Sequence, residues 1–178
     1  MLRPPSQRPL TLSARAEALE PSLTLAIAAK AKALKADGQD ICSLSAGEPD
    51  FDTPAFISEA AIEALRAGHT RYGPAAGEPA LREAIAAKLS QENLVPTRTE
   101  QVLVTNGGKQ ALYNLFQVLL GVGDELLLPA PFWLSYPEIA RLAGASVRLI
   151  PSSAADGFRL DPARLEAAIT PASKLLVL

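Results

Sequence analysis

A pair of glycines followed by a lysine is the part of this sequence whose residue types and spacing most directly indicate chemistry. Gly107, Gly108 and Lys109 come after an apolar β-branched run and before apolar residues at helical spacing. The first N–H groups of a helix have no partner within the helix and lie at the positive end of its dipole. Glycine lets the main chain approach a phosphate, and lysine adds positive charge. The turn is a candidate phosphate site, although a plain strand-to-helix turn can use glycine for its backbone angles alone.

The only tryptophan is the second candidate. Trp133 follows the strand expected over 125–128, and open α/β sheets bind ligands beyond the carboxyl ends of their strands. A large flat ring at this place could stack on an aromatic cofactor. It could equally fill the core at the edge of the sheet.

Alternating helices and strands are expected to position these residues. Pro21 and Ser22 open a first helix, and Gly38 ends it. The further helices are expected over 54–67, 79–91, 108–120, 135–143 and 162–169, and the strands over 41–44, 101–105, 125–128, 146–150 and 174–178. This alternation predicts an α/β fold with a mainly parallel sheet covered on both faces.

Details of the helices can be predicted as well. The helix over 54–67 is expected to have Thr53 as its N-cap and to bury Ile57, Ala61 and Leu65. Residues 1–20 are expected to form a mobile arm.

Composition excludes several classes of protein. With 178 residues, 48% of them apolar, the chain can bury a core of one domain or slightly more. A net charge of −2 and no basic cluster argue against a nucleic-acid or anionic-membrane surface, so a small-molecule partner is expected. No secretory signal or bilayer-spanning run is recognisable, which predicts a cytoplasmic protein.

The single cysteine and the single histidine carry no evident chemistry. Cys42 is expected to be a small buried apolar side chain, and it excludes a disulfide framework within this sequence. His69 has no second histidine or neighbouring cysteine with which to share a metal, so it is expected on a surface loop.

Four segments taken together resemble the class I aminotransferases, and within them the bacterial and plastid-type aspartate aminotransferases, some of which also use prephenate. The segments are Ser-Ala-Gly-Glu-Pro-Asp-Phe-Asp-Thr-Pro (45–54), Arg-Tyr-Gly-Pro-Ala-Ala-Gly (71–77), Asn-Gly-Gly-Lys-Gln-Ala-Leu (106–112) and Pro-Phe-Trp-Leu-Ser-Tyr-Pro (131–137). The resemblance implies a fold-type I enzyme that uses pyridoxal 5'-phosphate. Residues 1–50 would then form an N-terminal arm and small-domain segment, and residues 51–178 the first part of the large cofactor-binding domain.

The resemblance also implies roles for the candidate cofactor residues. Gly107, Gly108 and Lys109 match the turn that holds the cofactor phosphate, which agrees with the argument from the helix terminus. Trp133 matches the aromatic residue that stacks on the pyridine ring. Tyr72 matches a tyrosine that reaches the phosphate of the other subunit, which implies a homodimer.

Substrate-binding roles follow in the same way. Gly47 matches a glycine beside the substrate α-carboxylate, and Trp133 borders the same substrate site. Thr24 and Lys109 match positions facing the distal carboxylate. Glu20 departs from the basic residue of prephenate-active relatives, and its charge would repel a dianion. The expected reaction is therefore amino transfer between L-aspartate and 2-oxoglutarate, with prephenate as the alternative substrate.

The residues that carry the chemistry in this family come later than residue 178. None of the lysines, Lys109 and Lys174 included, matches the Schiff-base motif, so we expect an N-terminal fragment that is inactive by itself. Such a fragment would lack neighbouring strands, expose apolar faces and be poorly soluble. Other hypotheses are a catalytically inactive remnant of the fold, a related fold-type I lyase and an aromatic aminotransferase.

Overall fold

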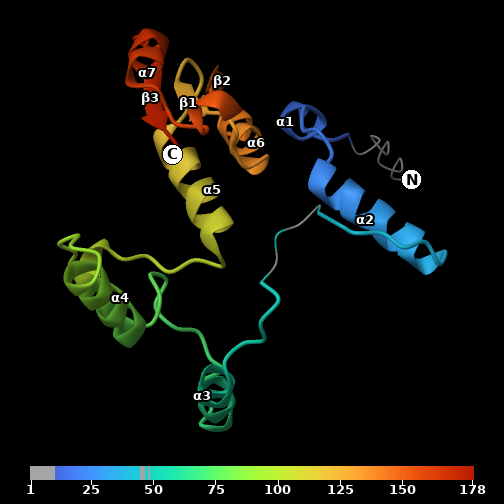
Figure 1. The fold of residues 1–178 in the computed structure, drawn as a ribbon. Helices are drawn as coiled ribbons and strands as arrows, with labels where there is room; N and C mark the ends of the chain where they lie inside the picture. Colours follow the sequence, from blue (N-terminus) through green and yellow to red (C-terminus); the bar gives the residue numbers. More distant parts are fainter. Residues whose placement is uncertain (1–10, 45–46, 48) are drawn as a thin grey trace, which may run out of the picture. The chain divides into compact units, whose positions relative to one another are not determined.

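The computed structural model describes residues 11–44, 47 and 49–178 (Figure 1). The chain divides into two compact units. The sheet unit combines Asn106–Leu178 with the N-terminal stretch that ends at Glu20, and the helical unit runs over Pro21–Thr105. Residues 1–10 of the predicted arm, and Ser45, Ala46 and Glu48 of the acidic loop, lie outside the described residues.

The sheet unit is built on three parallel strands in the order β2-β1-β3. Its elements are α1 (Ala14–Glu17), α5 (Gly108–Leu119), β1 (Glu125–Pro129), α6 (Ser135–Leu142), β2 (Ser146–Ile150), the 3₁₀ turn η2 (Ala154–Asp156), α7 (Pro162–Ala168) and β3 (Ser173–Leu176). The parallel α/β arrangement confirms the predicted fold class. Asp161 caps α7 through its side chain, and Pro162 is the first residue of that helix, as the Asp-Pro pair favours.

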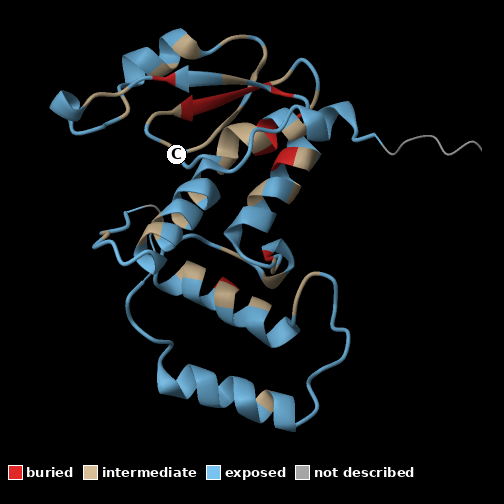
Figure 2. Ribbon diagram, turned by 90° about the vertical axis from the view of Figure 1, so that its right-hand side faces the viewer, coloured by how far each residue is buried: buried red, intermediate tan, exposed pale blue. Residues whose placement is uncertain are grey.

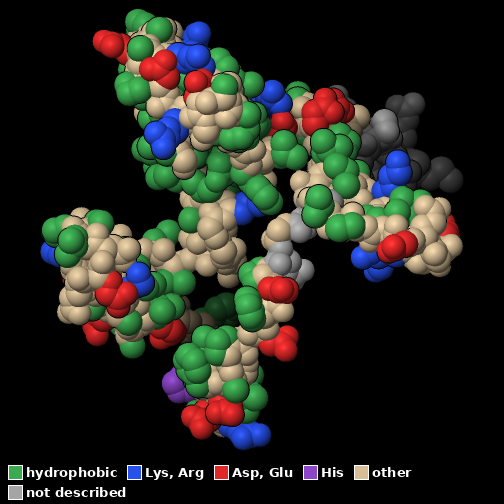
Figure 3. Space-filling view, in the orientation of Figure 1, with side chains coloured by type: hydrophobic (Ala, Val, Ile, Leu, Met, Phe, Trp, Pro, Cys, Tyr) green, Lys and Arg blue, Asp and Glu red, His purple; other side chains and the backbone are tan. Residues whose placement is uncertain are grey.

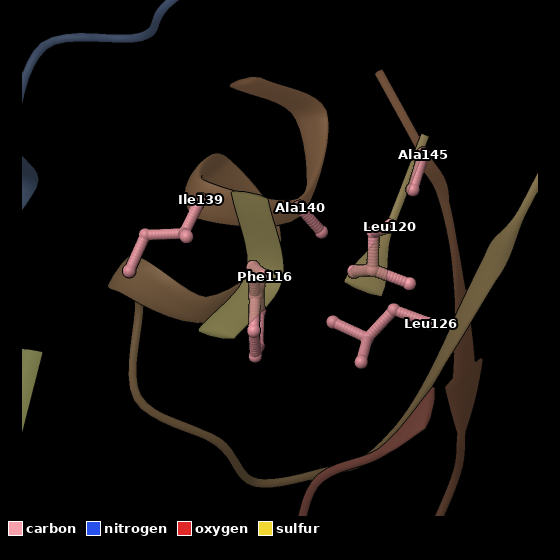
Figure 4. Close-up of a cluster of buried hydrophobic side chains, with 6 residues drawn as sticks. All are labelled: Phe116, Leu120, Leu126, Ile139, Ala140 and Ala145. Carbon is pink, nitrogen blue, oxygen red and sulfur yellow. The ribbon is translucent and has the colours of Figure 1, made fainter. Parts of the chain in front are cut away.

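The core of the sheet unit lies where α5 and α6 pack on β1. Phe116 and Ala140 are completely buried, as is Leu126 of the central strand. Leu120, Ile139 and Ala145 complete the cluster (Figure 4). Burying one large apolar side chain stabilises the folded state by about 1.5–3 kcal/mol, so this cluster fixes both helices on the strand. The buried residues in Figure 2 accordingly gather on the sheet and the helices next to it.

Two neighbouring carboxylates tie the three strands together where β1 begins. The buried Glu125 places its Oε1 2.9 Å from Arg148 Nε of β2, and it also accepts hydrogen bonds from Thr170 and Ser173. These donors lower the pKa of Glu125, with Arg148 contributing most, and Glu125 in turn raises the pKa of Arg148. Asp124 accepts a hydrogen bond from Lys174 of β3 at 3.0 Å, and this bond lowers the pKa of Asp124.

The helical unit consists of α2 (Leu23–Ala36), α3 (Ala55–Arg66), α4 (Pro79–Gln91) and the 3₁₀ turn η1 (Thr99–Gln101). Arg82 of α4 joins this helix to η1 and to the residue after it, donating to Thr99 O at 2.7 Å and Val102 O at 2.9 Å. A Cβ at Gly77 would lie 2.6 Å from Val104 Cβ, and φ at Gly77 is +103°. Only glycine therefore lets the loop over 71–77 pass this close to Val104.

Two predicted strands are wrong. Neither residues 41–44 nor residues 102–105 are in a strand, and Gln101 belongs to η1. Val102 is buried and has extended backbone angles, so its β-branched character does predict its local conformation. A strand also needs a neighbour to exchange hydrogen bonds, and the N–H of Val104 donates instead to the loop carbonyl of Ala76.

The apolar face predicted to be buried on α3 is exposed. Ile57 is 48% exposed and Leu65 62% exposed, and Ala61 is exposed as well. The helix begins one residue later than predicted, with Pro54 rather than Thr53 at its N-cap. Periodicity shows that a face is apolar, but another element must cover that face before it is buried, and the described residues supply none. Apolar side chains are widely visible on the surface in Figure 3.

Smaller predictions have mixed outcomes. Cys42 is exposed, so the prediction of a buried thiol is wrong. His69 is exposed, as predicted. Residues 14–17 of the expected mobile arm form α1, because Ser13 caps this turn by accepting from the N–H of Ala16. None of the helices in the described part of the chain is long and apolar enough to cross a membrane.

The carboxylate of Glu125 should make folding stability depend on pH. Its pKa in the folded state lies below the ordinary value of 4.5, so its stabilising effect is complete above about pH 4.5 and is lost as pH falls through the folded-state pKa. Glu125→Gln should therefore lower the melting temperature at pH 7, and the difference from wild type should shrink below pH 4.5.

The matched control is Glu166→Gln on the exposed surface of α7, which should leave the pH dependence of melting as it is in wild type. Melting curves of the complete protein between about pH 3 and pH 8, followed by circular dichroism, measure both variants. A constant difference between Glu125→Gln and wild type over this range would contradict the role given to the Glu125 charge.

Candidate functional site

The predicted phosphate turn forms the beginning of α5. Gly107 is the N-cap and has φ +80° and ψ 163°, a combination that is essentially restricted to glycine. Gly108 is the first helical residue, and a Cβ built on it would meet no atom within 4 Å. Backbone angles thus explain Gly107, whereas neither strain nor a described neighbour explains Gly108. A ligand that approaches the main chain at Gly108 would explain why this residue has no side chain.

Gln110 closes this turn and was not singled out from the sequence. Its Oε1 accepts a hydrogen bond from the N–H of Asn106 at 2.6 Å. Gln110 is the third residue after the N-cap Gly107, the position from which a capping-box glutamine bonds back to the N-cap N–H, but its donor here is the N–H of Asn106, one residue before the N-cap. The position of Gln110 three residues after Gly107 is therefore the feature of the sequence from which its role could have been predicted. The bond fixes how the chain enters α5, and with it the position of the two glycines.

Lys109 and Trp133 are brought together in the sheet unit. The ammonium nitrogen of Lys109 lies 5.9 Å from the centroid of the indole ring, within range of a cation–π interaction. A cation in the first turn of a helix is repelled by the dipole, and the electron-rich face of the ring offsets part of this cost. The turn therefore carries two positive elements, the helix terminus and a lysine, beside an aromatic surface.

Trp133 is half exposed, with 51% of its surface accessible, so the interpretation of this ring as a core filler is wrong. Its indole N–H donates a hydrogen bond to Ser135 Oγ at 3.0 Å. Ser135 is the second residue whose part in the arrangement was not recognised from the sequence. The tryptophan thus presents a flat, partly exposed surface that is held by hydrogen bonding at its edge.

The other predicted site residues belong to the helical unit. Gly47 is exposed, and a Cβ there would meet no atom within 4 Å. Thr24 lies in the first turn of α2 and is partly buried. Tyr72 is completely exposed. Their roles at the substrate and at a partner's phosphate stay predictions.

A separate pocket of about 240 Å³ lies in the sheet unit beyond the carboxyl end of β1. It is mostly apolar, with Leu128, Phe132 and Phe158 among its lining residues, and none of the described residues that line it carries a charged side chain. A phosphate therefore fits the start of α5 better than this pocket. In the described part of the chain, no group of three His, Cys, Asp or Glu residues is arranged to hold a metal ion.

The start of α5 with Trp133 can thus bind an anion that is joined to a flat aromatic ring. The helix terminus and Lys109 attract the anion, the glycines leave room for it, and the indole offers a stacking surface. These residues fit the phosphate and the pyridine ring of the cofactor expected from the sequence.

The comparisons with known proteins agree with this geometry. The model of the family described as aminotransferase class I and II matches residues 39–178. An aspartate/prephenate aminotransferase of Thermus thermophilus is 50% identical over 166 residues, which cover 93% of this chain and 43% of that protein. An aspartate aminotransferase of Geobacillus stearothermophilus is 46% identical over 95% of this chain and 43% of its own length.

Solved structures show the same similarity. The aspartate aminotransferase from Thermus thermophilus with maleate superposes with a TM-score of 0.92 at 49% identity, covering 95% of this chain and 44% of that chain. The aspartate aminotransferase from Rhizobium meliloti superposes with a TM-score of 0.87 at 38% identity, over 94% of this chain and 42% of its own. This chain therefore spans less than half the length of the relatives it matches.

Replacing each glycine of the turn by alanine should distinguish the glycine needed for its backbone angles from the glycine needed for phosphate binding. Gly107→Ala should lower stability by about 1–3 kcal/mol, because φ +80° is strained for alanine. Gly108→Ala should keep stability or raise it by up to about 1 kcal/mol, because its angles and surroundings accept a Cβ. Gly108→Ala should nevertheless weaken the binding of inorganic phosphate.

Chemical denaturation and calorimetric titration of the complete protein with inorganic phosphate measure the two effects. Gly157→Ala, in the exposed turn after η2, is the control for phosphate binding, which it should leave unchanged. Equal phosphate affinity of wild type and Gly108→Ala would remove the ligand explanation for Gly108.

Proposed function

Because this chain belongs to the class I and II aminotransferase family, we propose that the complete protein is an aspartate aminotransferase that transfers an amino group between L-aspartate and 2-oxoglutarate with pyridoxal 5'-phosphate. The chain covers 43% of a relative that is 50% identical to it, so the activity is proposed for the complete protein. The observation that carries the proposal is the glycine turn of α5 with Lys109 beside the ring of Trp133.

Within this chain, the proposed work is binding and orientation. The main chain at Gly107 and Gly108 would hold the phosphate, while Lys109 adds positive charge. Trp133 would stack on the pyridine ring and so fix its plane. Pyridoxal phosphate, when bound, supplies an electron sink for the reacting carbon of the amino acid. The cofactor would thus be oriented at two points, by its phosphate at the glycine turn and by its pyridine ring on the indole.

The positive charge of Lys109 supports the proposal that the substrate is a dicarboxylic amino acid. The ammonium group of Lys109 lies near the ring on which the cofactor would stack, where it could pair with a second carboxylate of the substrate. One structural relative is described with maleate, itself a dicarboxylate. We favour aspartate over prephenate because the exposed Glu20 adds negative charge where prephenate-active relatives tend to be basic. Thr24 and Gly47 are proposed to bind the distal carboxylate and the α-carboxylate of the substrate.

A homodimer in the cytoplasm completes the proposal. Tyr72 is fully exposed, which suits a side chain that reaches the cofactor phosphate of a second subunit. Large apolar side chains of α2 and α3 are exposed as well, Ile27 and Leu65 among them, and they would be covered in the complete assembly.

The proposal predicts that Lys109→Gln weakens the use of dicarboxylic substrates. Loss of one charged hydrogen bond should lower kcat/KM for aspartate by about 10- to 100-fold, and it should lower kcat/KM for phenylalanine far less. Lys35→Gln, at the exposed end of α2, is the control and should change neither value.

Coupled assays of the purified complete protein, loaded with pyridoxal phosphate, measure these constants with 2-oxoglutarate as acceptor. An equal loss for aspartate and phenylalanine would show that Lys109 does not recognise the second carboxylate. Absence of any amino transfer by a protein that binds the cofactor would overturn the proposed activity.

A further inference from the structure

The ring of Trp133 is held at its edge by a residue to which the proposed function gives no role. Its Nε1 is the only polar atom of the indole, and it donates to Ser135 Oγ at 3.0 Å. The two side chains are two residues apart, and Ser135 is the first residue of α6. The hydrogen bond therefore joins the ring to the beginning of a helix.

That helix is fixed to the core of the sheet unit. Ile139 and Ala140 of α6 are 6% and 0% exposed, and they pack in one cluster with Phe116 of α5 (Figure 4). The position of Ser135 is consequently set by buried packing one turn further along α6. The backbone of Ser135 therefore has a fixed position, and its hydroxyl group can accept the hydrogen bond that orients the half-exposed side chain of Trp133.

The same core also fixes the helix from which the group facing the ring projects. Lys109 projects from α5, whose Phe116 is buried in the cluster, and its ammonium nitrogen lies 5.9 Å from the ring centroid. The indole is thus held by two contacts from two packed helices, one at its edge and one over its face. Without the contact at the edge, an indole with 51% of its surface exposed would gain rotational freedom about its side-chain bonds.

We propose that Ser135 is a positioning residue, whose hydroxyl oxygen accepts the indole N–H of Trp133 and so fixes the plane of the ring on which the cofactor's pyridine stacks. The inference rests on the proposed function, since it presumes that this ring is the stacking surface. A ring already held in its binding orientation loses less conformational entropy when the cofactor binds, and this makes binding tighter.

The test compares two ligands on Ser135→Ala in the complete protein. Pyridoxamine 5'-phosphate carries both the ring and the phosphate, whereas inorganic phosphate reaches only the turn. The variant should bind pyridoxamine 5'-phosphate about three- to tenfold more weakly, which corresponds to one ordinary hydrogen bond. Its affinity for inorganic phosphate and its melting temperature without ligand should stay at the wild-type values.

Two further variants make the result specific. Ser135→Thr keeps the hydroxyl group and should restore the affinity for pyridoxamine 5'-phosphate. Ser153→Ala removes a serine hydroxyl that caps η2 in an exposed loop, and it should change neither ligand's affinity.

The outcomes separate this inference from the proposed function. If wild type binds pyridoxamine 5'-phosphate and Ser135→Ala binds it equally well, Ser135 does not position the ring. If Ser135→Ala weakens both ligands alike or lowers the melting temperature, its role is structural and the inference is overturned. If wild type binds inorganic phosphate but gains no affinity from the ring of pyridoxamine 5'-phosphate, Trp133 is not the stacking surface, and the proposed function fails with it.

Discussion

The packing of α5 and α6 on the central strand is the constraint on which the site depends. Phe116 and Ala140 come from the two helices and meet Leu126 of β1, and all three are completely buried. Helices packed through buried side chains cannot rotate without opening cavities, which are costly. Lys109 lies at the start of α5 and Ser135 at the start of α6, so the core that stabilises the sheet unit also positions the two helices from which the contacts on the ring of Trp133 are made.

A second constraint acts where β1 begins, and there charge rather than packing aligns the strands. Glu125 bonds to Arg148 of β2 and to Ser173 of β3, and Asp124 adds the bond to Lys174. Parallel strands are joined by long connections, so their register needs contacts that short turns cannot provide. Hydrogen bonds from three side chains to one buried carboxylate provide such contacts. The sheet is thus aligned by polar bonds where β1 begins and held by apolar packing along its length.

The helical unit shows how far a local pattern can determine structure. Ser22 caps α2, and Pro79 begins α4, as expected from residues that satisfy or tolerate the open end of a helix. The segment 55–66 is a helix, as predicted, yet neither α2 nor α3 contains a buried residue. Burial requires a second surface, and a helix's own sequence does not specify that surface. A strand likewise requires a neighbouring strand: Val102 has extended backbone angles and Val104 donates to a loop carbonyl, and neither is paired in a sheet.

The sequence by itself determined the family, the order of α-helices and strands from α5 onward, and the glycine turn with Lys109, because these depend on local spacing and on motifs read in order along the chain. It also indicated Trp133, but it left open whether the ring was buried. Only the tertiary structure decided that the ring is exposed, that Lys109 lies over it and that Ser135 holds its edge. These contacts depend on how two helices pack on one strand, and side-chain directions in three dimensions are fixed by that packing rather than by spacing along the chain.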